Sequence, residues 1–443
     1  MALDGGAYVP QPYYAFVQLY MNGQDLILTN NRPQHLISFT HTLETNATAS
    51  WSVELFDATF NLLEHQIWEQ STAGRRPILK FKYGYTGGVE SPYYYSELAQ
   101  VTPTWSYSGV TLRLEGTHVP GENQNIPTIW YKRDRAFVDM KISEIVEKLC
   151  TENGYVIDRA YFDETEPILL PQDLNSTNPI NKIFEQKGMS MEQFIKHFLL
   201  PYAVKAGTKQ GGYVFYIDHR TEPAKVRFYV PDKGPGMECP GVAAKRKYTI
   251  RQNKMEEWVD FTYDLGYGPK EATGIFEEAH FSIDPTTGEY VFEKYNVENQ
   301  KKFLRLYGHA YRKPQFTDEM NNVRMRPSHA PAILEDERKF FHRNHLIRKL
   351  RGKAMKATLT IVGDPRDDVF PGDFITIENI LPDGTPHYSS GCYIINKITH
   401  QISGGTYTTT FDISRNAAPK SPEARDSSEH PINNTSQVGG GGY

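Results

Sequence analysis

The chain has 443 residues, a length that allows about two to four domains with a core each. Hydrophobic residues make up 39% and charged residues 23%, which excludes a wholly disordered chain. The net charge of −5 excludes a global basic field for nucleic acid. The three cysteines, Cys150, Cys239 and Cys392, lie far apart in the sequence, so a disulfide framework is not expected. This cysteine usage fits a protein made in a reducing cytoplasm.

Membrane insertion and secretion are also not expected. No apolar run approaches the roughly 20 residues that cross a bilayer, and the N-terminus lacks the basic and apolar regions of a secretion signal. Aromatic residues reach 13% of the chain, a share that suits strands and subunit contacts. We therefore expect an intracellular, β-rich protein with large contact surfaces.

Residues 13–120 have the alternation of half-buried strands. Trp51, Val53 and Leu55 share one face of their segment, and residues 110–115 repeat this period of two. A further strand is predicted over 77–83, ended by Gly84 and a Gly87-Gly88 turn, and a helix over 61–70. Several short strands with turns between them predict a small barrel or sandwich.

From about residue 123 the period changes to that of helices. A stripe of apolar residues predicts a helix that Asn153-Gly154 would end. Ser190 and Gln193 form a capping-box pattern for a second helix that Pro201 would end. The two apolar faces are expected to consist of Ile142, Ile145, Val146, Leu149 and Cys150, and of Met191, Phe194, Ile195, Phe198 and Leu199.

The remaining segments mix strands and helices before the chain ends in a polar arm. Strands are predicted over 212–217, 225–230 and 258–263, a hairpin loop over 284–288, and helices over 297–307 and 332–350. Alternation returns over 357–361 and 407–413, with strands over 374–377 and 392–398 and a Pro371-Gly372-Asp373 turn. The residues from 417 onward are Pro, Ser, Asn and Gly, which predicts a flexible arm.

Two clusters of residues are candidate sites of chemistry. His342 and His345 share a helix face, but a zinc site needs a further ligand and arginines surround them, so a solvated face is favoured. Asp364, Asp367 and Asp368 lack the spacing of a calcium loop, so a polar turn between strands is favoured. Phosphate loops, nucleophile elbows and zinc-helix motifs are absent from the sequence. We therefore assign no catalytic, cofactor-binding or metal-binding residue.

A basic run from Lys339 to Lys353 could contact nucleic acid phosphates. Its aromatic residues, Phe340 and Phe341, are adjacent and look more like a core contact than a base-stacking platform. We favour a charged helix face that meets solvent or an acidic partner. No sequence-specific nucleic-acid binding and no membrane binding are expected.

Several short segments are informative through their order along the chain. They are residues 38–41, 51–57, 81–85, 103–112, 141–146, 153–154, 186–190 with Phe194, 369–373, 391–395, His400 and the final Thr-rich strand. Their order resembles that in the baseplate hub proteins of contractile-tailed phages, relatives of the late-control D proteins and of the hub portion of type VI secretion spikes. The resemblance spans about residues 13–416, although 296–325 match no pattern of that family and no lysozyme-like or peptidase-like segment is attached.

The resemblance implies a fold and an assembly. The fold would be α+β and β-rich, with a first hub barrel (1–122), an α+β domain (123–232), a middle insertion (233–345), a second hub barrel (346–416) that can draw strands from earlier segments, and a tail (417–443). Three chains would form a pseudo-sixfold ring joining the sixfold tail tube to the threefold central spike, around a channel for DNA. Further implied partners are the tape measure and baseplate wedge proteins, and the implied location is the virion tail, after assembly in the host cytoplasm.

Two other functions stay open from the sequence. A carbohydrate- or receptor-binding tail module would show exposed aromatic residues in a groove. A tail-associated cell-wall hydrolase would show two carboxylates at catalytic separation. The hub interpretation predicts a structural protein without enzymatic activity and a polar channel without a strongly basic lining.

Overall fold

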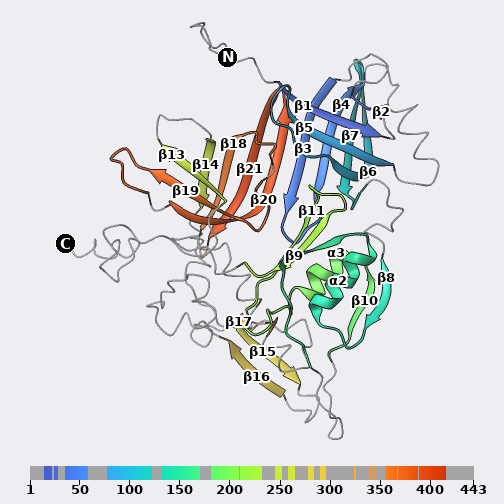
Figure 1. Cartoon of the computed structure of the whole chain (residues 1–443), viewed down its shortest axis with the longest axis vertical. Helices are drawn as coiled ribbons and strands as arrows, with labels where there is room; N and C mark the ends of the chain where they lie inside the picture. Colours follow the sequence, from blue (N-terminus) through green and yellow to red (C-terminus); the bar gives the residue numbers. More distant parts are fainter. Residues whose placement is uncertain are drawn as a thin grey trace, which may run out of the picture.

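The computed structural model describes the chain in the following ranges: 14–21, 24–27, 35–57, 77–121, 132–169, 181–208, 210–231, 245–251, 258–264, 278–283, 290–295, 324–325, 340–341, 344, 355–366, 368–387 and 389–415. Strands dominate these ranges, so the expectation of a β-rich fold is confirmed. Figure 1 shows a large curved sheet in two parts, with a smaller α+β unit beside it.

The large sheet has 13 strands, and the N-terminal part of the chain supplies seven of them. The alternation in the sequence is seen directly: inward residues of β4 and β7 are buried and their neighbours are partly exposed. These inward residues form one core with Leu19, Phe39 and Phe81. The seven strands are β1 (Ala15–Met21), β2 (Gln24–Asp25), β3 (His35–Glu44), β4 (Ser50–Asp57), β5 (Ile78–Tyr85), β6 (Tyr94–Ser106) and β7 (Gly109–His118).

The other strands of this sheet come from the second half of the chain and surround a second core, which includes Leu359, Ile395 and Phe411. The predicted alternation in β18 and β21 is confirmed, and Gly404 and Gly405 form the tight turn with positive φ that joins β20 to β21. The strands are β13 (Arg246–Arg251), β14 (Trp258–Asp264), β18 (Met355–Val362), β19 (Phe374–Ile380), β20 (Gly391–Ser403) and β21 (Thr406–Arg415).

The sheet contains one strand order twice. The first repeat runs β3-β4-β7-β6-β5-β1, and the second repeat runs β14-β18-β21-β20-β19-β13. The bulges repeat too. The first residues of β6 pair with β5, and the first residues of β20 pair with β19. After a bulge, β6 continues along β7 only and β20 continues along β21. The final strand differs, because β1 is antiparallel to β5 whereas β13 is parallel to β19.

The α+β unit packs around two helices, and both sequence predictions are confirmed. Helix α2 (Ile142–Glu152) buries the predicted stripe and ends at Asn153. Ser190 and Gln193 form the capping box of α3 (Met191–Phe194). The strands of the unit are β8 (Arg133–Phe137), β9 (Val156–Phe162), β10 (Phe184–Met189), β11 (Val214–Asp218) and β12 (Lys225–Tyr229).

One residue of the second helical face was predicted wrongly. Phe198 is 43% exposed, whereas Leu199 is buried. The cause is the π-helical turn η3 (Ile195–Leu199), which follows α3 and in which the Leu200 N–H donates to the Ile195 carbonyl oxygen. A π turn is wider than an α turn, so the buried stripe moves by one residue.

A small sheet of β15 (Glu278–Ile283), β16 (Tyr290–Tyr295) and β17 (Arg324–Met325) completes the described strands. The antiparallel pairing of β15 and β16 agrees with the predicted hairpin, although its loop lies outside the described residues. The predicted helices over 61–70 and 297–307 also lie outside them. Of the predicted helix over 332–350, Phe340, Phe341 and Asn344 are described and are helical.

The cysteines correct one expectation. Cys150 is free and buried in α2, but Cys392 on β20 is disulfide-bonded. An odd number of cysteines leaves one cysteine unpaired but does not prevent the other two from forming a disulfide. Within the described residues, no helix has the length and apolarity needed to span a membrane.

Candidate functional site

The candidate site is the junction where β20 joins the two repeats. The first residues of β20 pair with β19, and the residues from Lys397 onward pair with β3 instead, while β21 lies along the other edge. The change of partner occurs at the bulge of Asn396, whose carbonyl oxygen accepts a hydrogen bond from the Thr45 N–H at 3.0 Å. The two repeats are therefore joined by a backbone ladder, and not only by a linker.

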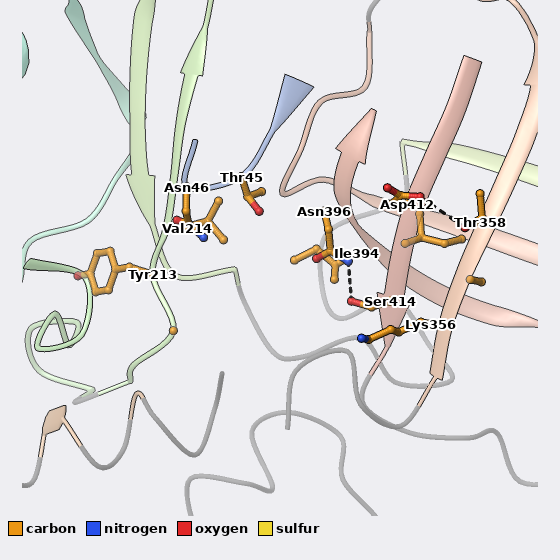
Figure 2. Close-up of a pocket in the computed structure, with 13 residues that line it drawn as sticks. Thr45, Asn46, Tyr213, Val214, Lys356, Thr358, Ile394, Asn396, Asp412 and Ser414 are labelled. Carbon is orange, nitrogen blue, oxygen red and sulfur yellow. Dashed lines mark hydrogen bonds between the residues drawn. The ribbon is translucent and has the colours of Figure 1, made fainter. Parts of the chain in front are cut away.

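A polar cavity of about 440 Å³ lies at this corner. The turn after β3 lines it on one side and β18 and β21 line it on the other, as Figure 2 shows. The Asn396 amide donates to Ser414 Oγ at 2.9 Å, and the Thr358 hydroxyl donates to Asp412 at 3.4 Å. Because these polar side chains hydrogen-bond to each other, we interpret the cavity wall as a structural contact between the two repeats and the α+β unit.

Asn46 fastens the junction to the α+β unit. Its backbone N–H donates to the Phe215 carbonyl oxygen at 2.7 Å, and its side-chain oxygen accepts from the Phe215 N–H at 3.0 Å. The φ of Asn46 is 60°, a conformation that Asn tolerates better than most residues. The same turn reaches α3, because the Thr48 hydroxyl donates to Glu192 at 2.8 Å.

Four buried histidines form a column across the junction. His400 of β20 lies opposite His41 of β3 in the ladder, with ring centroids 5.8 Å apart. His41 stacks at 4.9 Å on His118 of β7, and His118 lies 4.6 Å from His219, which follows β11. The column thus links the second repeat, the first repeat and the α+β unit.

The surroundings of three of these histidines, His41, His118 and His219, favour the neutral imidazole. Burial lowers the pKa of His41 and of His118 well below the usual value, and neighbouring histidines lower both further. Burial also lowers the pKa of His219 to about 4, against the opposing effect of Asp218. The His41 Nδ1 shares a 2.9 Å hydrogen bond with the Tyr83 hydroxyl. At neutral pH His41, His118 and His219 are therefore uncharged and contribute to the column by packing.

A second contact clamps the turn before β19 to the α+β unit. The Phe370 ring has the Arg227 guanidinium 3.7 Å and the Lys245 ammonium 3.8 Å from its centroid. Arg227 bonds Asp218 at 3.0 Å, and Lys245 bonds Asp373 at 2.7 Å. Burial raises the pKa of Asp373 to about 6, against the pull of Lys245. The cations are neutralised locally, so this cluster is a structural clamp and not a ligand site.

The aspartate cluster weighed in the sequence is a set of ion pairs. Asp364 bonds Arg246 and also Arg366, and Asp368 bonds Arg246 at 2.6 Å. Burial alone would raise the pKa of Asp364, but the two arginines lower it to about 2. The cluster lies between β18 and β19, as the predicted polar turn requires, and Asp367 lies outside the described residues.

The histidine pair and the basic run that the sequence offered as candidate sites are only partly described by the structure. His342, His345 and most of the run from 339 to 353 lie outside the described residues. Phe340 is buried in the core of the α+β unit with Phe341 packed against it, which confirms the core contact. Among the described residues, no group of three or more His, Cys, Asp or Glu side chains is placed to hold a metal ion.

Sequence reasoning did not find the histidine column. His41 and His400 appeared only within segments that resemble the hub family, and His118 and His219 carried no signal. Alternation indicates that such residues point inward, but the cross-strand pairing that stacks them is long-range.

No protein-family model matches the sequence. No curated protein matches it either. Solved structures similar in fold include a tail protein from Neisseria meningitidis (10% identity, TM-score 0.48, covering 91% of this chain and 97% of that one) and the 43 kDa tail protein of prophage MuSo2 from Shewanella oneidensis (9%, 0.49, 90% and 98%). A component of the Escherichia coli type VI secretion system is also similar (11%, 0.47, 90% and 77%). These are tail and type VI secretion proteins, the kinds of protein that the sequence resembles. At this level of similarity they do not determine what this chain binds.

Proposed function

We propose that this chain is a structural, non-enzymatic hub subunit of a contractile phage-type tail. Three copies would form a ring that joins the sixfold tail tube to the threefold central spike and leaves a channel for DNA. The tube protein, the spike protein, the tape measure protein and the wedge proteins are its proposed partners. The proposed location is the baseplate of the virion, after assembly in the host cytoplasm.

The observation that carries the proposal is the repeated strand order, fused through the ladder of β20 and β3. A chain that contains one unit twice offers two nearly equivalent positions. Three such chains offer six, so they can match a sixfold partner on one side and a threefold partner on the other. The ordered segments that resemble hub proteins point to the same role.

The finer organisation follows from the same proposal. Each repeat would be a small barrel, with domains at 1–122, 123–232, 233–345 and 346–416 and a tail at 417–443. Strands β13 and β14 pair with β19 and β18, so the second barrel would include strands from before residue 346. The net charge of −5 supports a polar channel without a strongly basic lining, which lets DNA slide.

A carbohydrate- or receptor-binding module is the second candidate, because two aromatic rings, Tyr20 of β1 and Tyr93 just before β6, lie next to each other. Tyr93 there is 39% exposed and lies 6.5 Å from Tyr20. The Lys80 ammonium, however, lies 4.3 Å from the centroid of the Tyr93 ring and that of Lys82 lies 5.2 Å from it. Sugars stack on open aromatic faces, and the two lysines cover this one. The tyrosine pair therefore supports a carbohydrate site less strongly than the repeated strand order supports the hub.

The test is the mass of the purified full chain in solution by light scattering, alone and mixed with the spike and tube proteins of the same particle. A trimer, alone or with the spike protein, is the expected result. A chain that stays monomeric with every tail component and binds or cleaves a polysaccharide would overturn the proposal.

A further inference from the structure

The two repeats pair their strands in the same way, but the strands at their edges have different neighbours. On the edge of β20 beyond its bulge, β3 pairs with residues 397–403. On the corresponding edge of β6, β5 pairs only with Tyr94–Glu97, and among the described strands none follows it. Strand β14 corresponds to β3 and ends the sheet in the described part of the chain, with β18 as its neighbour.

The equivalence holds residue by residue. The hairpin pairs Lys397↔Asp412 and Ser403↔Thr406 correspond to Gln100↔Glu115 and Ser106↔Gly109. Pairing of β3 with β4 shifts between Leu36 and Ser38, and pairing of β14 with β18 shifts at the matching place, between Trp258 and Asp260. The register of β20 on β3 can therefore be transferred to β6 and β14.

Gln401 pairs with Thr40 at the junction. Their equivalents are Thr104 on β6 and Thr262 on β14. We propose that β6 of one copy pairs antiparallel with β14 of a neighbouring copy, in the register that sets Thr104 opposite Thr262. The pairing reproduces the internal junction between copies, so the sheet would continue around the ring. The inference rests on the proposed function for the number of copies, but its register rests on the repeat alone.

The two edges suit this pairing. Thr104 and Thr262 are both exposed, as is Asp260, which would face Ser106. Their polar side chains keep the edges soluble before assembly. Pro103 would lie opposite Tyr263, and because proline has no N–H, the ladder is one donor short there. An edge that lacks a donor pairs less readily with arbitrary strands, which favours pairing that is supported along its whole length.

Disulfide crosslinking tests the register. In an antiparallel ladder, directly opposed residues lie about 4.5–5.5 Å apart between Cα atoms, within the range of a disulfide. The full-length double variant Thr104→Cys/Thr262→Cys, oxidised under mild conditions and run on a non-reducing gel, is expected to give covalent dimers and trimers as the main species. The matched control is Thr102→Cys/Thr262→Cys, which moves one cysteine by two residues along β6 and is expected to stay mostly uncrosslinked.

The outcomes separate this inference from the proposed function. A trimer by light scattering without crosslinking of the Thr104 pair overturns the inference and leaves the hub proposal standing. Crosslinking of the Thr102 pair in preference to the Thr104 pair also overturns it, because the register is then different. A monomer under all conditions with the tail partners overturns both.

Discussion

Acidification should destabilise the chain through its histidine column, and His219 permits the clearest estimate. The pKa of His219 is lowered by burial to about 4, from a usual value near 6.5. The unfolded chain therefore binds a proton as the pH falls through 6.5, while the folded chain binds it only near pH 4. Stability from this residue is present at neutral pH and is lost as the pH falls from 6.5 towards 4.

The expected magnitude follows from these two values. Between pH 7.5 and pH 5, the preferential protonation of the unfolded state should cost about 2 kcal/mol of unfolding free energy for His219 alone. His41 and His118 should add to this in the same direction, because burial lowers the pKa of each. Asp218 opposes the lowering of the His219 pKa only in part, and its carboxylate also forms ion pairs with Arg220 and Arg227 at 2.6 and 3.0 Å.

The assay is urea-induced unfolding at pH 7.5, 6 and 5, followed by near-ultraviolet circular dichroism, for the unaltered chain and for His219→Gln. Glutamine cannot take up a proton in this range, so the variant should lose about 2 kcal/mol less on acidification than the unaltered chain. The matched control is His197→Gln, which makes the same substitution at an exposed histidine on η3, outside the column. Equal losses in His219→Gln and the unaltered chain would refute the reasoning.

Three further substitutions test the junction and its attachments, each by the urea midpoint at pH 7.5. Gly372→Ala should destabilise by about 2 kcal/mol or more, because φ is 98° and an added Cβ would lie 2.7 Å from the Tyr229 hydroxyl; an unchanged midpoint would contradict this geometry. Ser190→Ala should cost about 1 kcal/mol through loss of the α3 cap, with Ser190→Asp as the variant that restores it. Asn46→Ala should cost about 1–3 kcal/mol because the Phe215 N–H loses its side-chain acceptor, and Asn46→Gly should show whether the positive φ contributes separately.

The sequence predicted local structure well where one period dominates. The alternation of Trp51, Val53 and Leu55 became β4, and the stripe from Ile142 to Cys150 became α2. These elements bury one face each, so the period of apolar residues reports their conformation directly. Phe198 was predicted wrongly because a π turn changes the period within the helix, and no residue type in the sequence predicts a π turn.

The junction could not be predicted because it depends on pairings between distant segments. His41 and His400 are opposed only because β20 leaves β19 at Asn396 and continues beside β3. Nothing in the two strands encodes that partner, since each offers the same alternating pattern to any neighbour. Two barrels were expected from the family resemblance alone, because the two repeats share their strand order and not an evident sequence. Phe39 and Phe261, for example, occupy matching places.

The ladder at the junction explains how the proposed ring could close. Two repeats joined by a flexible linker would sample many relative angles, and each angle would have to be fixed again on assembly at an entropic cost. Here β20 and β3 pair from Lys397↔Glu44 to Ser403↔Ser38, and the histidine column and the Asn46 turn hold the same corner. The edges of β6 and β14 are therefore presented at one fixed angle within each chain. If the same pairing forms between chains, the internal angle sets the angle at every contact, so the geometry of a single chain determines how many copies close the ring.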